Sequence, residues 1–235
     1  MSTDTQPAWV ITPPARATLP INNRSQRFPV HRVYCVGRNY AAHAVEMGHD
    51  PDREPPFFFQ KNPDNVLAGA DVLFPYPSAS SDVHHEIELV VALASGGVDI
   101  PVEQAVDCVW GYAVGLDMTR RDLQAEAKQR GRPWEVGKAF EYSAPCSPVY
   151  AAAEIGHPAQ GRVWLTVNDQ LRQEGDLAQM IWKVPEIIAY LSRLFTLRPG
   201  DLIMTGTPAG VGPVQRGDVL LGGIDSIGQL RVRVS

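Results

Sequence analysis

The sequence predicts a mixed, mostly β fold with three or four short helices, arranged as one domain behind an N-terminal arm. Short β-prone runs separated by glycine and proline recur along the chain, and residues 109–116 are typical of them. Only residues 184–195 show the i, i+3, i+4, i+7 spacing of apolar side chains that marks an amphipathic helix. The longest strongly apolar run, 89–94, is far too short to span a bilayer.

Composition narrows the class of protein further. Of 235 residues, 44% are hydrophobic and 20% are charged, which is typical of a globular protein. The formal net charge of -5 gives no sign of nucleic-acid binding. Cys35, Cys108 and Cys146 are odd in number and far apart, and residues 1–30 lack the apolar core of a signal peptide. We therefore expect a cytoplasmic protein with neither a disulfide framework nor a membrane partner.

Local signals predict the elements of the first part of the chain. Residues 1–29 are proline-rich and aperiodic, which favours an extended arm or an edge strand, so the domain is expected to cover residues 30–235. The elements then expected, in order, are a strand at 33–36, a helix at 40–47 that begins at Asn39 and ends at Gly48, and strands at 57–60 and 66–74 around a turn at 62–65.

Local signals also predict the elements of the rest of the chain. Residues 86–93 begin with polar–apolar alternation and become wholly apolar, which indicates a strand entering the core. Thr119 followed by Asp122 resembles a capping box and predicts a helix that ends at Gly131. The other expected elements are a short helix at 101–106, strands at 109–116 and 163–167, a hairpin turn at Asn168 and Asp169, the amphipathic helix with Pro185 in its first turn, and short strands from 200 to 234.

A pair of glutamates gives the sharpest chemical signal. On a strand, Glu86 and Glu88 point to the same face, about 7 Å apart, and they repel each other unless a cation lies between them. Asp117, at the end of another predicted strand, offers a third oxygen donor for a hard ion such as Mg²⁺ or Mn²⁺. The alternatives are an exposed strand face with a turn aspartate, or a zinc or iron site that includes His84 and His85. No third histidine or cysteine lies at ligand spacing for the latter.

Two further features are candidates for catalysis. His43 and Glu46 share a face of the predicted helix, so the carboxylate can orient the imidazole as a water-activating base, or the two form an exposed pair. Lys138 lies beside small and apolar residues, where its charge could stabilise an enolate, although a surface lysine is equally common. The glycine-rich segment 205–213 lacks the patterns of a phosphate-binding or dinucleotide-binding loop and indicates a tight loop near a ligand.

Together these segments resemble the fumarylacetoacetate hydrolase family from about residue 34 to the C-terminus. The order of the landmarks carries the resemblance, since each alone is weak. They are VGRNYAAHAVEM at 36–47, FFQK at 58–61, HHEIEL at 84–89, GLDMTRRDLQ at 115–124, KAF at 138–140, VNDQLRQ at 167–173 and TGTPAGVGP at 205–213. Within the family, the shorter acylpyruvate hydrolase branch is most similar, and residues 53–59 resemble fumarylpyruvate hydrolases. One departure is Asn62 after Lys61, where those proteins usually have proline, so a substrate contact from Lys61 is not carried over.

The resemblance implies a β-sandwich roll, a homodimer and a set of site residues. Its implied roles are Mg²⁺ or Mn²⁺ binding by Glu86, Glu88 and Asp117, catalysis by His43, Glu46, Lys138 and Gln124, and substrate binding by Arg38, Arg121 and Thr207. It also implies hydrolytic cleavage of a carbon–carbon bond in a 2,4-diketo acid, with fumarylpyruvate from aromatic catabolism as the expected substrate. A decarboxylase of oxaloacetate or a keto–enol isomerase on the same site is the alternative. A metal-dependent binding protein without activity is a remote one.

Overall fold

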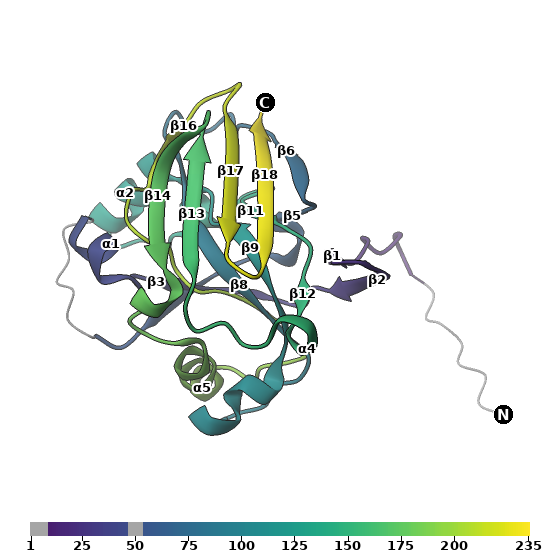
Figure 1. Cartoon of the computed structure of the whole chain (residues 1–235). Coiled ribbons are helices and arrows are strands. Elements are labelled where there is room, and N and C mark those ends of the chain that lie inside the picture. Colours follow the sequence, from purple (N-terminus) through teal and green to yellow (C-terminus); the bar gives the residue numbers. More distant parts are fainter. Residues whose placement is uncertain (1–8, 47–53) are drawn as a thin grey trace.

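Two β-sheets pack face to face and enclose the main core, as the computed structural model of the chain shows (Figure 1). The structure describes residues 9–46 and 54–235, without the side chains of residues 43–45. The larger sheet has eight strands and the smaller has five. This arrangement confirms the predicted mostly β fold and the sandwich roll.

The strands of the large sheet come from the whole length of the chain. In sheet order they are β4 (Phe57–Lys61), β3 (Val33–Gly37), β15 (Leu202–Met204), β8 (Ile87–Leu93), β9 (Val109–Leu116), β11 (Ala144–Cys146) and β5 (Val66–Ala68), with β12 (Tyr150–Ala151) paired to β9. The strand order shows that β15, which lies late in the sequence, separates β3 from β8. It is parallel to the former and antiparallel to the latter.

The other sheets cover and extend the large one. The five-stranded sheet has the order β14 (Gln170–Asp176), β13 (Arg162–Val167), β17 (Val219–Ile224), β18 (Gly228–Val234) and β6 (Asp71–Phe74). A small sheet joins β10 (Thr119–Arg120), β7 (Val83–His85) and β16 (Gly212–Val214), and a hairpin pairs β1 (Thr18–Ile21) with β2 (Arg24–Pro29). Whether residues 1–29 are a unit apart from the domain stays a prediction.

Strand β8 is apolar after Glu88 because both of its faces are covered. Leu89 and Val91 point into the core between the two large sheets, while Val90 and Ala92 belong to a second core. That second core is closed by the β1–β2 hairpin, through residues that include Phe28. Burial on both faces explains why the polar–apolar alternation predicted at the start of this strand stops after its first residues.

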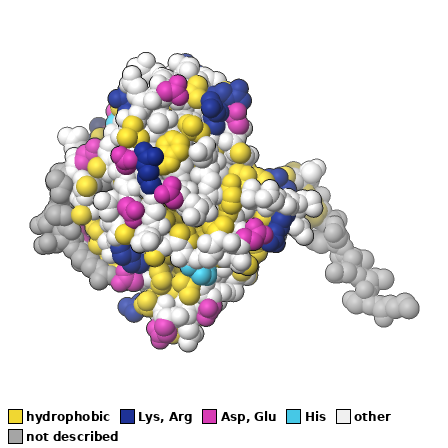
Figure 2. Space-filling view, in the orientation of Figure 1, with side chains coloured by type: hydrophobic (Ala, Val, Ile, Leu, Met, Phe, Trp, Pro, Cys, Tyr) yellow, Lys and Arg dark blue, Asp and Glu magenta, His cyan; other side chains and the backbone are white. Residues whose placement is uncertain are grey.

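The helices are short, as predicted. They are α1 (Ala41–Glu46), α2 (Arg121–Gln129), α3 (Glu135–Lys138), α4 (Ala152–Ile155) and α5 (Val184–Leu194), with 3₁₀ helices η1 (Pro63–Asn65), η2 (Val102–Cys108) and η3 (Leu177–Gln179). None of the helices in the described ranges is long and apolar enough to cross a membrane. On the face seen in Figure 2, acidic and basic side chains are interspersed.

Helix α5 confirms the predicted amphipathic helix but ends its buried face early. Its first turn has Pro185, and the Glu186 carboxylate accepts a hydrogen bond of 2.9 Å from the Lys183 backbone N–H. Ile187 and Leu191 are buried in the main core. Leu194 and Phe195 follow the same spacing, yet they are 56% and 37% exposed because the helix stops there.

Three local predictions are wrong for reasons of tertiary structure. Thr119 does not cap a helix: it lies in β10, and α2 begins only at Arg121. The Asp122 carboxylate instead accepts hydrogen bonds from the Ser80 hydroxyl and from the Ser81 backbone N–H. The strand predicted at 66–74 divides into β5 and β6, which belong to different sheets. Asn39 does not cap α1 either, because its side chain is hydrogen-bonded to the backbone of Trp182 and Thr205.

The α5 packing yields a stability prediction. Leu191→Ala should lower the free energy of unfolding by about 2–5 kcal/mol, because it leaves a cavity in the main core. Leu194→Ala is the matched control on the same helix and should change it by less than about 0.5 kcal/mol. Urea denaturation followed by circular dichroism measures both values. Equal losses in the two variants would contradict the burial assigned to α5.

Candidate metal and active site

Three carboxylates meet where β8 and β9 come together. Glu88 lies on β8, Glu86 directly precedes it, and Asp117 directly follows β9. The two strands are antiparallel neighbours, and the backbone N–H of Asp117 donates to the Glu86 carbonyl oxygen at 2.8 Å. All three side chains are buried, and one oxygen from each lies within 4.8 Å of the others. The structure thus brings together the three residues that the sequence proposed as metal ligands.

Three cationic side chains surround this cluster. The Lys138 ammonium lies between two of the carboxylates, 2.9 Å from Glu86 and 2.7 Å from Asp117. Arg121 forms an ion pair with the other oxygen of Glu86. Lys61 is buried behind the cluster, with Nζ 2.9 Å from Asp117 Oδ1, and it also donates to the backbone carbonyl of Lys138. Lys61 therefore supports the carboxylates from behind and does not line the pocket.

Burial and like charges shape the protonation of the cluster. Burial, together with the nearby Asp117 and Glu86 carboxylates, raises the pKa of Glu88 well above its usual value. Burial by itself would lower the pKa of Lys138, but the same two carboxylates outweigh it and raise that pKa. The ammonium therefore keeps its charge, while the Glu88 carboxyl holds a proton to a higher pH than an ordinary glutamate.

The donor set fits a hard divalent cation. It consists of carboxylate oxygens alone, which Mg²⁺ and Mn²⁺ prefer. Asp117 Oδ1 is buried and forms an ion pair with Lys61, but within the described part of the chain it accepts no well-aligned hydrogen bond, so a lone pair remains for an ion. The alternative with histidine ligands is not supported. His84 pairs with Asp82 at 2.9 Å, and His85 is directed at an amide on β14.

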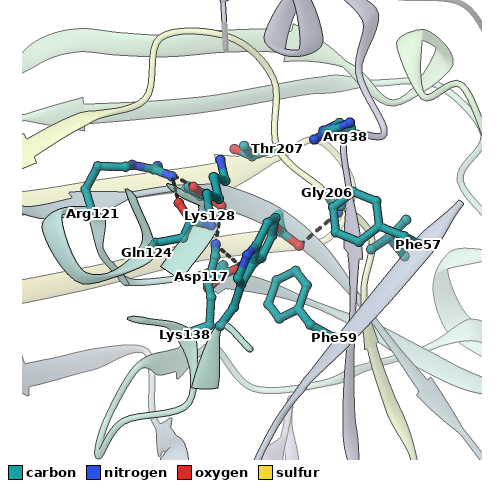
Figure 3. Close-up of a pocket in the computed structure, with 15 residues that line it drawn as sticks. Arg38, Phe57, Phe59, Asp117, Arg121, Gln124, Lys128, Lys138, Gly206 and Thr207 are labelled. Carbon is teal, nitrogen blue, oxygen red and sulfur yellow. Dashed lines mark hydrogen bonds and ion pairs between the residues drawn. The ribbon is translucent and has the colours of Figure 1, made fainter. Parts of the chain in front are cut away.

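A pocket opens from the carboxylates toward solvent (Figure 3). Its aromatic wall is formed by Phe57, Phe59 and Trp134. The centroid of the Trp134 ring lies 5.4 Å from that of Phe57 and 5.8 Å from that of Phe59. Two cations lie on this wall: Arg38 is 5.3 Å from the Phe57 ring, and Lys128 is 5.1 Å from the Trp134 ring. The pocket is therefore apolar on one side and strongly cationic at its rim.

The remaining predicted residues also reach the pocket. Gln124, on α2, lines it and accepts a hydrogen bond of 2.7 Å from Arg121. Because Arg121 can only donate, the oxygen of the Gln124 amide is occupied and its N–H₂ group is left to face elsewhere. Thr207 also lines the pocket, next to Gly206, whose backbone N–H donates to Glu88 at 2.8 Å.

Helix α1 lies beside the same loop. The Glu46 carboxylate accepts from the backbone N–H of Gly210 at 3.1 Å. The side chain of His43 lies outside the described residues, so its pairing with Glu46 stays a prediction. Asn39, just before the helix, donates to the carbonyl oxygens of Trp182 and Thr205 and accepts from the Trp182 N–H. It therefore fixes the start of α1 against the 205–210 loop.

Sequence reasoning missed four residues of the site. They are the residues that had no assigned role: Trp134, Lys128, Lys61 and Gln173. The two lysines carried a usable signal, because the chain has only four lysines and three of them meet here. Trp134 lies in a segment without periodicity, so nothing local pointed to the pocket.

Comparison with known proteins places most of the chain in one family. Residues 32–235 match the family described as fumarylacetoacetate (FAA) hydrolase C-terminal. The crystal structure of fumarylpyruvate hydrolase from Pseudomonas aeruginosa, in complex with Mn²⁺ and pyruvate, superposes with a TM-score of 0.95. Its sequence is 56% identical, over 97% of this chain and 99% of that one.

Other relatives have different activities. A mitochondrial oxaloacetate tautomerase from Mus musculus is 44% identical over 86% of this chain and 90% of its own length. The structure of a 5-carboxymethyl-2-hydroxymuconate delta-isomerase from Mycobacterium smegmatis has a TM-score of 0.76 and 30% identity, over 93% of this chain and 81% of that one. The relatives share this fold but differ in reaction, and the chain belongs to the fumarylacetoacetate hydrolase family.

Proposed function

We propose that the protein is a metal-dependent hydrolase that cleaves fumarylpyruvate into fumarate and pyruvate. The observation that carries the proposal is the buried cluster of Glu86, Glu88 and Asp117 at the base of a pocket with a cationic rim. The similarity to a fumarylpyruvate hydrolase that was crystallised with Mn²⁺ and pyruvate supports it.

Mg²⁺ or Mn²⁺ would be held by the three carboxylates of the cluster. When bound, the ion supplies positive charge that polarises a 2-oxo acid and favours its enolate. With the ion in place, Lys138 keeps a fixed positive charge next to the same carboxylates, where it acts on negative charge as that charge develops. The lysine is therefore assigned to stabilising the leaving group.

The hydrolytic step is assigned to residues around the distal ketone. His43, oriented by Glu46, takes a proton from water, and the resulting hydroxide adds to C4 of the diketo acid. Gln124 donates its free N–H₂ group to the oxyanion formed at that carbon. The C3–C4 bond then breaks, its electron pair leaves with the pyruvate enolate, and protonation of C3 gives pyruvate.

The rim of the pocket favours a substrate with a second carboxylate. Arg121, Lys138 and Lys61 are each paired with a cluster carboxylate. Among the described side chains, Arg38 and Lys128 have no carboxylate partner, and they lie at the wall of the same pocket. A fumaryl group ends in a carboxylate that would be attracted by these two cations, whereas the acetyl group of acetylpyruvate carries no charge.

Tautomerisation of oxaloacetate is the second candidate function, and the mouse relative is the observation that favours it. That reaction moves a proton next to the keto group and requires no attacking water. Decarboxylation of oxaloacetate would use the same charges. Hydrolysis is distinguished from both by its need for the His43–Glu46 pair as a base toward water.

We propose further that the protein works as a homodimer in the cytoplasm, in the breakdown of aromatic compounds. These statements rest on the resemblance to the acylpyruvate hydrolase branch. Size-exclusion chromatography with light scattering tests the dimer.

Turnover assays separate the candidate functions. The Mn²⁺-loaded protein should release pyruvate from fumarylpyruvate, and His43→Ala should slow this release by about 10²–10⁴-fold because the general base is lost. Metal affinity should stay within about twofold, since the histidine is not a ligand. Oxaloacetate tautomerisation, followed by the loss of enol absorbance, is measured in parallel. An equal loss of both activities would contradict the role in water activation, and no cleavage by the wild type would refute the hydrolase.

The rim prediction compares two substrates. Arg38→Met and Lys128→Met should each raise KM for fumarylpyruvate about tenfold or more, because each removes a charge-assisted contact to the distal carboxylate. For acetylpyruvate, KM should change by less than about threefold, since its acyl end is uncharged. Arg130→Met is the matched control, because Arg130 lies near the end of the same helix as Lys128 but is exposed and paired with Glu126. Similar effects on both substrates would contradict the assignment.

Metal affinity should rise with pH. The raised pKa of Glu88 means that its carboxyl keeps a proton to a higher pH than an ordinary glutamate, and this proton must leave before the oxygen can bind an ion. The Kd for Mn²⁺, measured by electron paramagnetic resonance, should therefore still fall with rising pH in the range where an ordinary glutamate, with a pKa of about 4.3, is already ionised, by at most about tenfold per pH unit. Glu88→Gln should bind more weakly and with a flatter pH dependence. A wild-type Kd that does not change over this range would contradict the prediction.

A further inference from the structure

The side chain of Gln173, on β14, connects the metal-binding strand to the loop that carries Thr207. It is completely buried and makes four hydrogen bonds. Its amide oxygen lies 3.1 Å from the Ile87 backbone nitrogen and 2.9 Å from His85 Nδ1, on either side of Glu86 in the sequence. Its amide nitrogen lies 2.8 Å from both Thr207 Oγ1 and the Pro208 carbonyl oxygen.

The partners determine which way this amide faces. The Ile87 backbone N–H can only donate, so the atom that faces it must be the amide oxygen of Gln173. The Pro208 carbonyl can only accept, so the atom that faces it must be the N–H₂ group. Since that nitrogen has only hydrogens to offer, Thr207 Oγ1 must accept from it.

This contact leaves the hydroxyl hydrogen of Thr207 for another acceptor. Within the described part of the chain, no hydrogen bond takes that hydrogen, and Thr207 lines the same pocket as Arg121 and Gln124 (Figure 3). We propose that Gln173 is a positioning residue that holds the Thr207 hydroxyl as a donor toward an anionic oxygen of a bound 2-oxo acid. The chemical class of the ligand rests on the proposed function.

The same amide gives the donor a fixed relation to the carboxylate cluster. Its oxygen binds the residues before and after Glu86, and its nitrogen binds two successive residues of the loop. The loop is also tied to Glu88, through the Gly206 N–H. The Thr207 hydroxyl and two of the proposed metal ligands are therefore joined through one buried side chain and one backbone bond, with no exposed link between them.

Gln173→Glu changes the hydrogen bonds of this side chain to the loop and can keep those to Ile87 and His85. The variant has nearly the same shape, and one of its oxygens can still accept from Ile87 and His85. On the loop side the ionised carboxylate cannot donate, so the threonine hydroxyl must turn toward residue 173. The protonated carboxyl has one hydrogen for two acceptors and leaves either Thr207 or Pro208 without a donor, so Gln173→Met, which has no donor in any form, is measured beside it. Gln170→Glu is the matched control, because it adds the same group to an exposed position of the same strand.

The test is a double-mutant cycle with Thr207→Val. The probe is oxalate, a small dianion that resembles the carboxylate and keto oxygens of a 2-oxo acid, titrated calorimetrically into the Mn²⁺-loaded protein. Gln173→Glu and Thr207→Val should each raise the Kd of oxalate about tenfold or more, as expected for a lost hydrogen bond to a charged group. The double variant should bind within about twofold of Thr207→Val alone, because the glutamine acts through the hydroxyl. Thr207→Ser should restore most of the affinity.

Several results would overturn the proposal. They are losses that multiply in the double variant, an unchanged Kd in both Gln173→Glu and Gln173→Met, or wild-type protein that does not bind oxalate. If Gln173→Glu fails to fold, the cycle is run with Gln173→Met alone, because methionine cannot donate to Thr207 either. Coupled oxalate binding without fumarylpyruvate cleavage would refute the proposed function and keep this inference. Cleavage of fumarylpyruvate, together with losses of oxalate affinity that multiply in the double variant, would keep the proposed function and refute this inference.

Discussion

The repulsion among three buried carboxylates is the constraint on which the rest of the site depends. Negative groups this close in a dry environment require positive charge nearby. The chain supplies it from three separate elements: Lys61 at the end of β4, Arg121 at the start of α2 and Lys138 at the end of α3. The short helices after β10 are thus placed where their cations are needed.

One glycine-rich loop serves two groups of the site at once. Its backbone N–H groups donate to Glu88 through Gly206 and to Glu46 through Gly210. Both glycines have φ of +93°, and a Cβ at Gly210 would lie 2.1 Å from the carbonyl oxygen of Arg172. The loop was expected to approach a ligand with its backbone, and in the structure that backbone binds carboxylates of the protein itself.

The sequence predicted features that depend on neighbours along the chain and missed those that depend on distant contacts. The spacing of Glu86 and Glu88 and the apolar pattern of α5 are local, and both predictions agree with the structure. The capping box at Thr119 failed because β10 pairs with β7, which makes the threonine part of a strand. Gln173 was visible only as part of a motif, since its partners lie 34 to 88 residues away. No spacing rule reaches that far.

The position of β15 also constrains how the protein can be made. Strand β15 (residues 202–204) lies between β3 and β8 in the large sheet and pairs with both. These two strands are therefore not joined within the sheet until β15 is in place. A nascent chain on the ribosome therefore cannot close this sheet until nearly nine-tenths of the sequence has emerged. Arg38, which follows β3, can therefore join the carboxylate cluster on β8 and β9 only after β15 has been synthesised, because long-range pairing of this kind comes after local structure.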